Sequence, residues 1–501
     1  MQSPSPDHGM PPREGRAGGL SDDRGRAAAA PPASAHHWLL LAGVIAVSAL
    51  LRVAFLGAKS FDIDESASIT YARLAWPQFL HTLAWDANMW LYYTLLRLWA
   101  GLGDSEAVIR SLSVVPAVAT LPVVYALGNR FFGRRVALIA VVLLAVNAFH
   151  VAYAQNARGY SLVVFLVALS SLFFVRGIER QSWRDWAAYV LTGVLAIYCH
   201  VFAGLALVAQ WVSLAVLPAR QVRWRTVSLC IVLILLLALP LGVFVSTKRA
   251  VIPQPNPKDL AGLFYDLTGG ADAHKILLRV PVAAYFLVCL LAAVSAARLW
   301  ASRKAPQEVW PYGLLLAWLW VPILLTFAIS VVKPIFLRRY LIVCLPPLVL
   351  LASVGLSQIR PRWAFVGALT VLVGLGLHGV YYYYADTPYE TGDQDNRAAT
   401  RYILAHAEPG DAALFYASGM EIPFNYYRGR FRDLASGSSI TILPDRAWRG
   451  APPTYRRVWL FLSQDDARTR QAIQAWLAGR YAAIAEQHFL GVRVLLYSKQ
   501  E

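Results

Sequence analysis

The chain has 501 residues, of which 57% are hydrophobic and only 15% charged, with a formal net charge of +17. A soluble protein would carry about 25% charged residues, so this composition excludes a soluble globular enzyme and predicts a membrane protein with many spans. The positive charge requires no nucleic-acid partner, because arginine-rich loops facing anionic lipid headgroups account for it. The four cysteines lie in or beside apolar runs and show no disulfide or metal-binding spacing.

The first 36 residues are rich in Pro, Gly, Ala, Ser and Arg and contain few large apolar side chains. Such a segment cannot bury enough apolar surface to fold, so we expect residues 1–36 to form a disordered cytoplasmic tail. The apolar run from Trp38 to about Leu56 is too long for the core of a signal peptide and lacks a convincing cleavage site. We predict that it is an uncleaved transmembrane helix.

Further apolar runs follow, each close to the roughly 20 residues that cross a bilayer, and they bring the expected number of spans to about eleven. Loops rich in arginine alternate with poorer ones, which the positive-inside rule explains if the N-terminus is cytoplasmic and the C-terminal region lies outside. The predicted runs are 106–127, 136–153, 160–175, 186–200, 201–217, 227–246, 279–298, 310–331, 338–357 and 364–383.

The loop after the first span, about residues 58–105, carries a cluster of carboxylates at Asp62, Asp64 and Glu65, with Asp86 further on. Its many Trp, Tyr and Leu residues predict short amphipathic helices along the outer membrane surface. Carboxylates there can serve as general bases or cation ligands, and the alternative is that they are solvated charges at the end of a helix. If this segment is extended, Asp62 and Asp64 point the same way.

Several cations on the predicted outer face break the positive-inside rule and call for an explanation. Lys248 and Arg249, in a long loop at 247–278, are explained by side chains that reach toward the headgroups. Arg158 and the pair Arg338 and Arg339 stand directly at helix starts beside aromatic residues. For these we favour a phosphate partner over the same headgroup explanation, because guanidinium matches phosphate oxygens bidentately.

From about residue 385 to residue 501 the composition becomes polar, and strands alternate with helices. This pattern predicts a small extracytoplasmic α/β domain after a transmembrane domain at 37–384. We find no catalytic constellation in it. The expected strands are Ala412–Ala417, Ile440–Leu443, Arg457–Leu462 and Val492–Tyr497, and the expected helices are Asn396–His406 and Arg468–Arg480.

A series of short motifs on the predicted outer face occurs in an order that resembles a known family. The chain resembles the bacterial protein-mannosyltransferase-like family, glycosyltransferase family 39, which is related to the aminoarabinose transferases of lipid A, over about residues 38–400. It departs from relatives at Asn88-Met89-Trp90, where they often have His-Pro-Pro, and at Asn156, where they often have Glu. The motifs are Asp64-Glu65, Leu91-Tyr92-Tyr93, Glu106 with Arg110-Ser111, Tyr153-Ala-Gln155 with Ala157-Arg158-Gly-Tyr160, Tyr198-Cys-His200 and Arg339-Tyr340-Leu341.

The resemblance implies a mainly α, polytopic GT-C fold and transfer of a sugar from a polyprenyl-phosphate donor to an acceptor hydroxyl outside the bacterial plasma membrane. It implies Asp64 as the catalytic base, with Glu65 beside it, and leaves open whether the two share a divalent cation. The donor would be a hexosyl or pentosyl lipid, and the acceptor a protein, lipid or glycan. The expected substrate-binding residues are Asp86, Tyr92, Tyr93, Gln155, Arg158, Tyr160, His200, Arg338, Arg339 and Tyr340.

The residues fit this chemistry independently of the resemblance. Displacing a polyprenyl phosphate with a hydroxyl needs a base for the hydroxyl proton and cations for the leaving phosphate. A single in-line displacement would invert the anomeric centre.

Two other functions compete with an enzyme. A transporter or flippase of lipid-linked sugars would place its ionisable groups near the bilayer midplane, often in repeated halves. Here the acids cluster outside the spans and no repeat is evident, which favours the enzyme. A non-catalytic scaffold or sensor that binds a ligand through its C-terminal domain is the third hypothesis.

Overall fold

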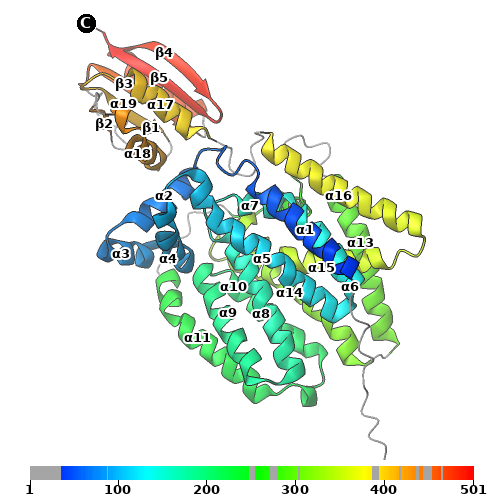
Figure 1. Ribbon diagram of the computed structural model, residues 1–501. Helices are drawn as coiled ribbons and strands as arrows, with labels where there is room; N and C mark the ends of the chain where they lie inside the picture. Colours follow the sequence, from blue (N-terminus) through cyan, green and yellow to red (C-terminus); the bar gives the residue numbers. More distant parts are fainter. Residues whose placement is uncertain are drawn as a thin grey trace, which may run out of the picture. The chain divides into compact units, whose positions relative to one another are not determined.

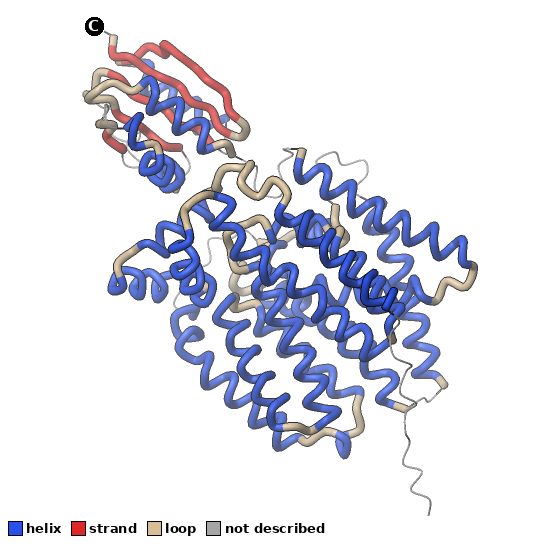
Figure 2. The backbone as a smooth tube through the Cα atoms, viewed as in Figure 1, coloured by secondary structure: helices blue, strands red, loops and turns tan. Residues whose placement is uncertain are grey.

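The computed structural model describes residues 35–86, 88–246, 254–270, 279–302, 305–385, 394–416, 419–435, 439–443, 454–463 and 467–500. Most of these residues are helical, and the strands are confined to the C-terminal part of the chain (Figure 2). The predicted tail lies almost entirely outside the described residues. Leu41–Glu501 forms one compact unit, and the predicted domain boundary near residue 385 stays a prediction.

Among the described residues, eight helices are long and apolar enough to cross a membrane, or nine if a bent pair counts as one span. In the bent pair, α6 (Arg134–Ala145) and α7 (Ala148–Ala154) meet at 61°. Every predicted span coincides with a helix, but α9 (Trp183–Cys199) and α10 (Ala203–Ser213) are shorter, so the count of eleven is not confirmed. The eight are α1 (Ala35–Val53), α5 (Glu106–Phe132), α8 (Tyr160–Arg180), α11 (Trp224–Ser246), α13 (Arg279–Ala301), α14 (Pro306–Ser330), η4 (Arg338–Cys344) continued by α15 (Leu345–Ser357), and α16 (Arg362–Tyr384).

Short helices occupy the long loops between spans. The loop after α1 forms α2 (Ile63–Arg73), α3 (Trp76–Asp86) and α4 (Trp90–Trp99), which confirms the short helices expected there (Figure 1). A further helix, α12 (Pro257–Leu267), was not expected in the loop at 247–278. Lys248 and Arg249 of that loop lie outside the described residues. Short 3-10 turns complete the connections: η1 (Ala100–Leu102), η2 (Leu214–Val216) and η3 (Ala219–Gln221).

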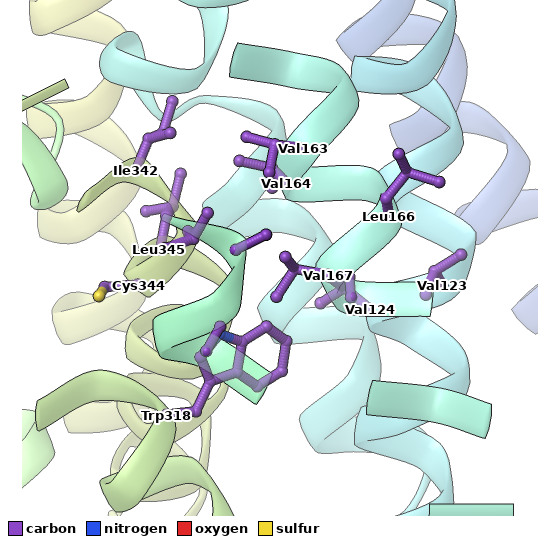
Figure 3. Close-up of a cluster of buried hydrophobic side chains, with 14 of the residues drawn as sticks. Val123, Val124, Val163, Val164, Leu166, Val167, Trp318, Ile342, Cys344 and Leu345 are labelled. Carbon is purple, nitrogen blue, oxygen red and sulfur yellow. The ribbon is translucent and has the colours of Figure 1, made fainter. Parts of the chain in front are cut away.

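The centre of the helical bundle is filled by tightly packed apolar side chains from α5, α8, α14, η4 and α15 (Figure 3). Trp318 of α14 is among them and is only 1% exposed. Helices α13 and α15 come into backbone contact, since a Cβ atom at Gly355 would lie 1.7 Å from the carbonyl oxygen of Val288. Because lipid tails are as apolar as these side chains, such close packing, more than the hydrophobic effect, holds membrane helices together.

Side chains at the ends of α1 and α7 satisfy free carbonyl groups at the ends of neighbouring helices inside the bundle. Arg52, fully buried near the end of α1, donates to the carbonyl oxygens of Leu144 (3.1 Å) and Ala145 (3.0 Å) at the end of α6 and contacts Nδ1 of His150 at 2.7 Å. In return, Nε2 of Gln155 donates to three carbonyl oxygens at the end of α1, at 2.7–3.4 Å. The last carbonyls of a helix have no partners within it, so this exchange fixes the bend between α6 and α7 against α1.

The C-terminal part contains a five-stranded sheet in the order β2-β1-β3-β5-β4. Strand β1 pairs in parallel with β2 and β3, whereas β5 runs antiparallel to β3 and β4. On β3, Trp459 and Phe461 face a cluster with α17, and Leu460 and Leu462 face α20, so both faces are covered. The elements are α17 (Asn396–His406), β1 (Ala412–Tyr416), α18 (Glu421–Arg430), α19 (Arg432–Ala435), β2 (Thr441–Ile442), β3 (Arg457–Ser463), α20 (Ala467–Ala478), β4 (Tyr481–Phe489) and β5 (Val492–Lys499).

The expected α/β pattern of this part is confirmed, since all four predicted strands and both predicted helices are present. The sequence did not predict β4, α18 or the short α19. Strand β4 reads Tyr-Ala-Ala-Ile-Ala-Glu-Gln-His-Phe and has one β-branched residue, so it lacks the composition by which strands are recognised.

Candidate active site

The acidic segment after α1 forms the start of a helix. Asp62 is the N-cap of α2, and its Oδ1 accepts a hydrogen bond of 2.7 Å from the backbone N–H of Glu65. The Glu65 carboxylate accepts in return from the N–H of Asp62 at 3.3 Å, which completes a capping box. The expectation of an extended segment is therefore wrong, and neighbouring acids point about 100° apart around the helix axis.

Glu65 points into the protein and is fully bonded there. Its carboxylate is 2% exposed and accepts two hydrogen bonds from Arg110 of α5, at 2.8 and 2.6 Å, and one from the N–H of Ala157 at 2.7 Å. Arg110 also donates to three carbonyl oxygens of the segment Leu56–Ser60, at 2.8–3.1 Å. Glu65 is thus bonded as the partner of a buried cation, which leaves little of its carboxylate for a substrate proton.

Asp64 points the other way, toward two arginines. Its side chain is 39% exposed, and its Oδ2 lies 3.2 Å from Nη2 of Arg339, at the start of η4. Nη1 of Arg158 donates to the hydroxyls of Tyr93 (2.8 Å) and Ser68 (3.3 Å). The positive charge of Arg158, followed by that of Arg339, lowers the pKa of the Asp64 carboxyl against the opposing effect of burial. Asp64 is therefore ionised at neutral pH.

A pocket opens beside these acids and brings together segments far apart in the sequence. Five of the predicted site residues line it: Asp64, Glu65, Gln155, Tyr160 and Arg339. Asn156, where relatives often have Glu, also faces it. The other lining residues, which the sequence did not single out as site residues, are Lys59, Ser60, Asp62, Arg110, Ala152, Tyr153, Tyr383 and Gln394.

Behind the pocket lies an aromatic cluster around His200. The ring of His200 is 4.6 Å from that of Tyr340 and 5.8 Å from that of Tyr160, and Phe202 completes the group. Burial, with the charges of Arg158 and Arg339, lowers the pKa of His200 to about 3. The histidine is therefore neutral at physiological pH, and it supports Tyr160 from outside the pocket lining.

The remaining predicted residues are not brought to the pocket lining. The hydroxyl of Tyr92 lies 2.9 Å from that of Ser113, inside the protein. Arg338 is paired at 3.0 Å with Asp266 of α12, whereas its neighbour Arg339 is the one paired with Asp64. Asp86 ends α3, and its side chain lies outside the described part of the structure.

Within the residues that the structure describes, no three His, Cys, Asp or Glu side chains gather as a metal site would require. The divalent cation considered for Asp64 and Glu65 stays a prediction. The two arginines beside Asp64 suit an anion instead, because guanidinium groups bind phosphate oxygens through charge-assisted hydrogen bonds.

Comparison with known proteins shows which family and which folds this chain resembles. The model of the family described as dolichyl-phosphate-mannose-protein mannosyltransferase matches residues 90–244. The structure of ArnT from Cupriavidus metallidurans in the apo state is similar with a TM-score of 0.57 at 15% identity, covering 93% of this chain and 98% of that one. A comparison with curated protein sequences finds no match.

Two solved complexes share the fold. ArnT from the same organism bound to undecaprenyl phosphate gives a TM-score of 0.55 at 14% identity, covering 92% of this chain and 98% of that one. AglB, the oligosaccharyltransferase of Archaeoglobus fulgidus, in complex with an inhibitory peptide and a dolichol-phosphate, gives 0.52 at 11% identity, covering 93% and 74%.

The segment matched by the family model contains α4, α5, α7 and α8 with Arg110, Arg158 and His200, whereas Asp64 and Arg339 lie outside it. Identities of 11–15% to the solved structures establish the fold alone. The chain is thus a multi-pass membrane protein with the GT-C fold, and its predicted resemblance to the protein-mannosyltransferase-like family is confirmed.

Proposed function

We propose that the protein transfers a sugar from a polyprenyl-phosphate-linked donor to an acceptor hydroxyl on the outer face of the bacterial plasma membrane. The observation that carries this proposal is the ionised carboxylate of Asp64 held at a pocket against Arg339, with Arg158 close by. The family match supports the reaction type, and ArnT and AglB, which share the fold, have been solved with polyprenyl phosphates.

In the proposed reaction, the oxygen of the acceptor hydroxyl attacks the anomeric carbon from the side opposite the phosphate. The bond between that carbon and the phosphate oxygen breaks, and its electron pair leaves with the phosphate. Asp64 takes the hydroxyl proton, and Arg339 and Arg158 stabilise the charge that develops on the leaving group. One in-line displacement inverts the anomeric centre.

The Asp64–Arg339 contact suggests how donor binding prepares the base. The guanidinium of Arg339 has Asp64 as its carboxylate partner at 3.2 Å. The positive charges of Arg158 and Arg339 together lower the pKa of Asp64. A phosphate that binds Arg339 draws its guanidinium away from Asp64, and the negative charge of the phosphate screens that of Arg158. The carboxyl then becomes more basic when the donor is in place, and the donor binds before the acceptor reacts.

The orientation of the protein is part of the proposal. The arginine-rich loops predict a cytoplasmic N-terminus, which places α2 and the pocket outside. Cysteine replacements at Thr70 of α2 and Ser302 after α13, both exposed, would test this. We expect a membrane-impermeant thiol reagent to label Thr70→Cys in intact cells and Ser302→Cys only after lysis. The reverse labelling would contradict the orientation.

The function itself can be tested with purified protein in proteoliposomes. Hexosyl and pentosyl polyprenyl phosphates, radiolabelled in the sugar, are offered with candidate acceptors, and released polyprenyl phosphate and labelled product are measured. We expect release that depends on the acceptor and is lost in Asp64→Asn. Movement of intact lipid-linked sugar across the vesicle membrane without cleavage would contradict the enzyme and favour a flippase.

A further inference from the structure

The segment between α1 and α2 leads directly into the acidic turn but has no regular secondary structure of its own. Residues Gly57–Phe61 form a turn, a bend and irregular backbone. Buried peptide N–H and C=O groups need partners, so the side chains that bond this segment decide where Asp62, Asp64 and Glu65 are held. Arg110 supplies one set of donors from α5.

The second set comes from residues more than 300 positions further along the chain. Nη1 and Nη2 of Arg397, in α17, donate to the carbonyl oxygens of Gly57 (3.2 Å) and Ala58 (2.6 Å). Nδ2 of Asn396 donates to the carbonyl oxygen of Phe61 at 2.9 Å. These contacts fix both ends of the connecting segment from the side of α17.

Three further hydrogen bonds join the segment to α18, to the first residue of α17 and to Gln394 just before it. The N–H of Phe61 donates to the hydroxyl of Tyr427 at 2.7 Å. The backbone N–H of Asn396 donates to the hydroxyl of Ser60 at 3.1 Å, and that hydroxyl donates to the carbonyl oxygen of Gln394. Both the N–H and the C=O of Phe61, the residue before Asp62, are therefore bonded by side chains of the C-terminal part.

Glu106, the first residue of α5, anchors the same group of side chains. It is 4% exposed and accepts hydrogen bonds from Arg430 (2.7 Å), Arg397 (3.2 Å) and the hydroxyl of Tyr427 (3.0 Å). Glu106 lies one helical turn before Arg110 on α5. Both sets of donors are thus attached to the N-terminal end of α5. Arg110 belongs to that helix, and the side chains of the C-terminal part bond to Glu106.

We propose that Asn396, Arg397 and Tyr427 are positioning residues that clamp Gly57–Phe61 and so hold Asp64 at the pocket. This proposal rests on the proposed function and assigns the C-terminal part a role in it. Gln394 lines the pocket itself, so the segment leading into α17 reaches the site as well as the clamp. The acidic turn is held between α5 and this clamp.

The first test removes one hydroxyl. Tyr427→Phe deprives the N–H of Phe61 of its acceptor and Glu106 of one donor. Tyr481→Phe is the matched control, since it also removes one hydroxyl from the C-terminal part, where that hydroxyl bonds the carbonyl of Tyr455. Hydrogen–deuterium exchange of the purified full-length protein is followed on peptides covering residues 57–66. We expect several-fold faster exchange there in Tyr427→Phe and wild-type exchange in Tyr481→Phe.

Kinetics then separate positioning from simple loss of stability. A small displacement of a reacting group can cost up to about 100-fold in rate, so we expect kcat to fall about 10-fold in Tyr427→Phe. KM for the donor should change less than twofold, because Arg158 and Arg339 make none of the clamp contacts. Arg397→Ala should lose more, about 10- to 100-fold in kcat, and Arg397→Lys should recover part of that loss.

Faster exchange together with lower kcat supports the clamp. Unchanged exchange in Tyr427→Phe, or faster exchange with unchanged kcat in both Tyr427→Phe and Arg397→Ala, would overturn it. A wild-type protein that transfers no sugar would instead contradict the proposed function. In that case the exchange measurement still decides whether the clamp holds the acidic turn.

Discussion

The first turn of α2 has two faces that carry adjacent carboxylates in opposite surroundings. The anchored face consists of Glu65 with Arg110 and Ala157, and its carboxylate is 2% exposed and fully bonded. The open face consists of Asp64 with Arg158 and Arg339, and its carboxylate is 39% exposed with one ion pair. Because consecutive helical residues point about 100° apart, a single turn can hold the chain in place and present a base.

The largest effect is expected on the anchored face. Removing one partner of a buried ion pair costs about 3–5 kcal/mol, because the other charge is left unpaired. Arg110→Ala should therefore lower the thermal midpoint in detergent sharply and reduce the yield of folded protein. Glu65→Gln combined with Arg110→Met leaves no unpaired charge and should recover much of the loss. A stable, fully active Arg110→Ala protein would remove the distinction between the two faces.

On the open face the expected loss is catalytic. Asp64→Asn keeps the size of the side chain but cannot take the proton, so transfer should fall about 10²- to 10⁴-fold at an unchanged thermal midpoint. Asp104→Asn is a suitable control, since Asp104 is 51% exposed in the same loop region and pairs with Arg73. If a stable Glu65→Gln protein loses transfer while Asp64→Asn retains it, the roles of the faces are reversed.

A smaller effect is expected at the arginines of the open face. Arg339→Lys and Arg158→Lys keep the charge but lose the bidentate geometry, so donor KM should rise about tenfold, in keeping with hydrogen bonds to charged groups worth about 1.5–3 kcal/mol. Steady-state assays with varied donor measure this. Arg338→Lys is the matched neighbour, because Arg338 pairs with Asp266, and it should leave donor KM unchanged. Equal KM values in all three variants would exclude a phosphate site here.

The smallest effect concerns Asp62, which caps the turn between the two faces. Burial, with the neighbouring charges of Glu65 and Asp64, raises the pKa of Asp62 to about 7. The folded protein therefore binds this proton more tightly than the unfolded chain, and the resulting stability is lost as the pH rises from about 4 through 7.

Asp62→Asn should abolish that pH dependence and raise stability at pH 8 by at least about 1 kcal/mol, since one pKa unit corresponds to about 1.4 kcal/mol. Thermal midpoints of both proteins at pH 5 and pH 8 measure this. Transfer should change little. A wild-type thermal midpoint that is no lower at pH 8 than at pH 5 would contradict the raised pKa of Asp62.

The sequence predicted the class of the fold because its signals are local. The lengths of the apolar runs located every helix long enough to span a membrane. The Trp- and Tyr-rich composition of the loop after α1 predicted the short helices α2, α3 and α4. The helical start at Asp62 was also readable, since Asp62-Ile-Asp-Glu65 has the spacing of a capping box. Asn256-Pro257 with Asp259 carries the same signal for α12.

Other features of the site could not be predicted because they depend on contacts between distant residues. Glu65 and Arg110 are separated by 45 positions, and Glu106 and Arg430 by 324. The residues next to Glu65 in the sequence do not indicate that its carboxylate pairs with Arg110 while the carboxylate of Asp64 remains exposed. The pairing of Arg338 with Asp266 likewise depends on α12, a helix that the sequence did not predict.

Arg52 of α1 is bonded by residues that are synthesised long after it. Apart from Ser48 on its own helix, the partners of Arg52 are Leu144, Ala145 and His150, which emerge from the ribosome more than ninety residues later. A charged side chain within an apolar span is costly in lipid. From the end of α1 its guanidinium can reach the headgroups until those partners are present, so α1 takes its final position in the bundle only once α6 and α7 are in place.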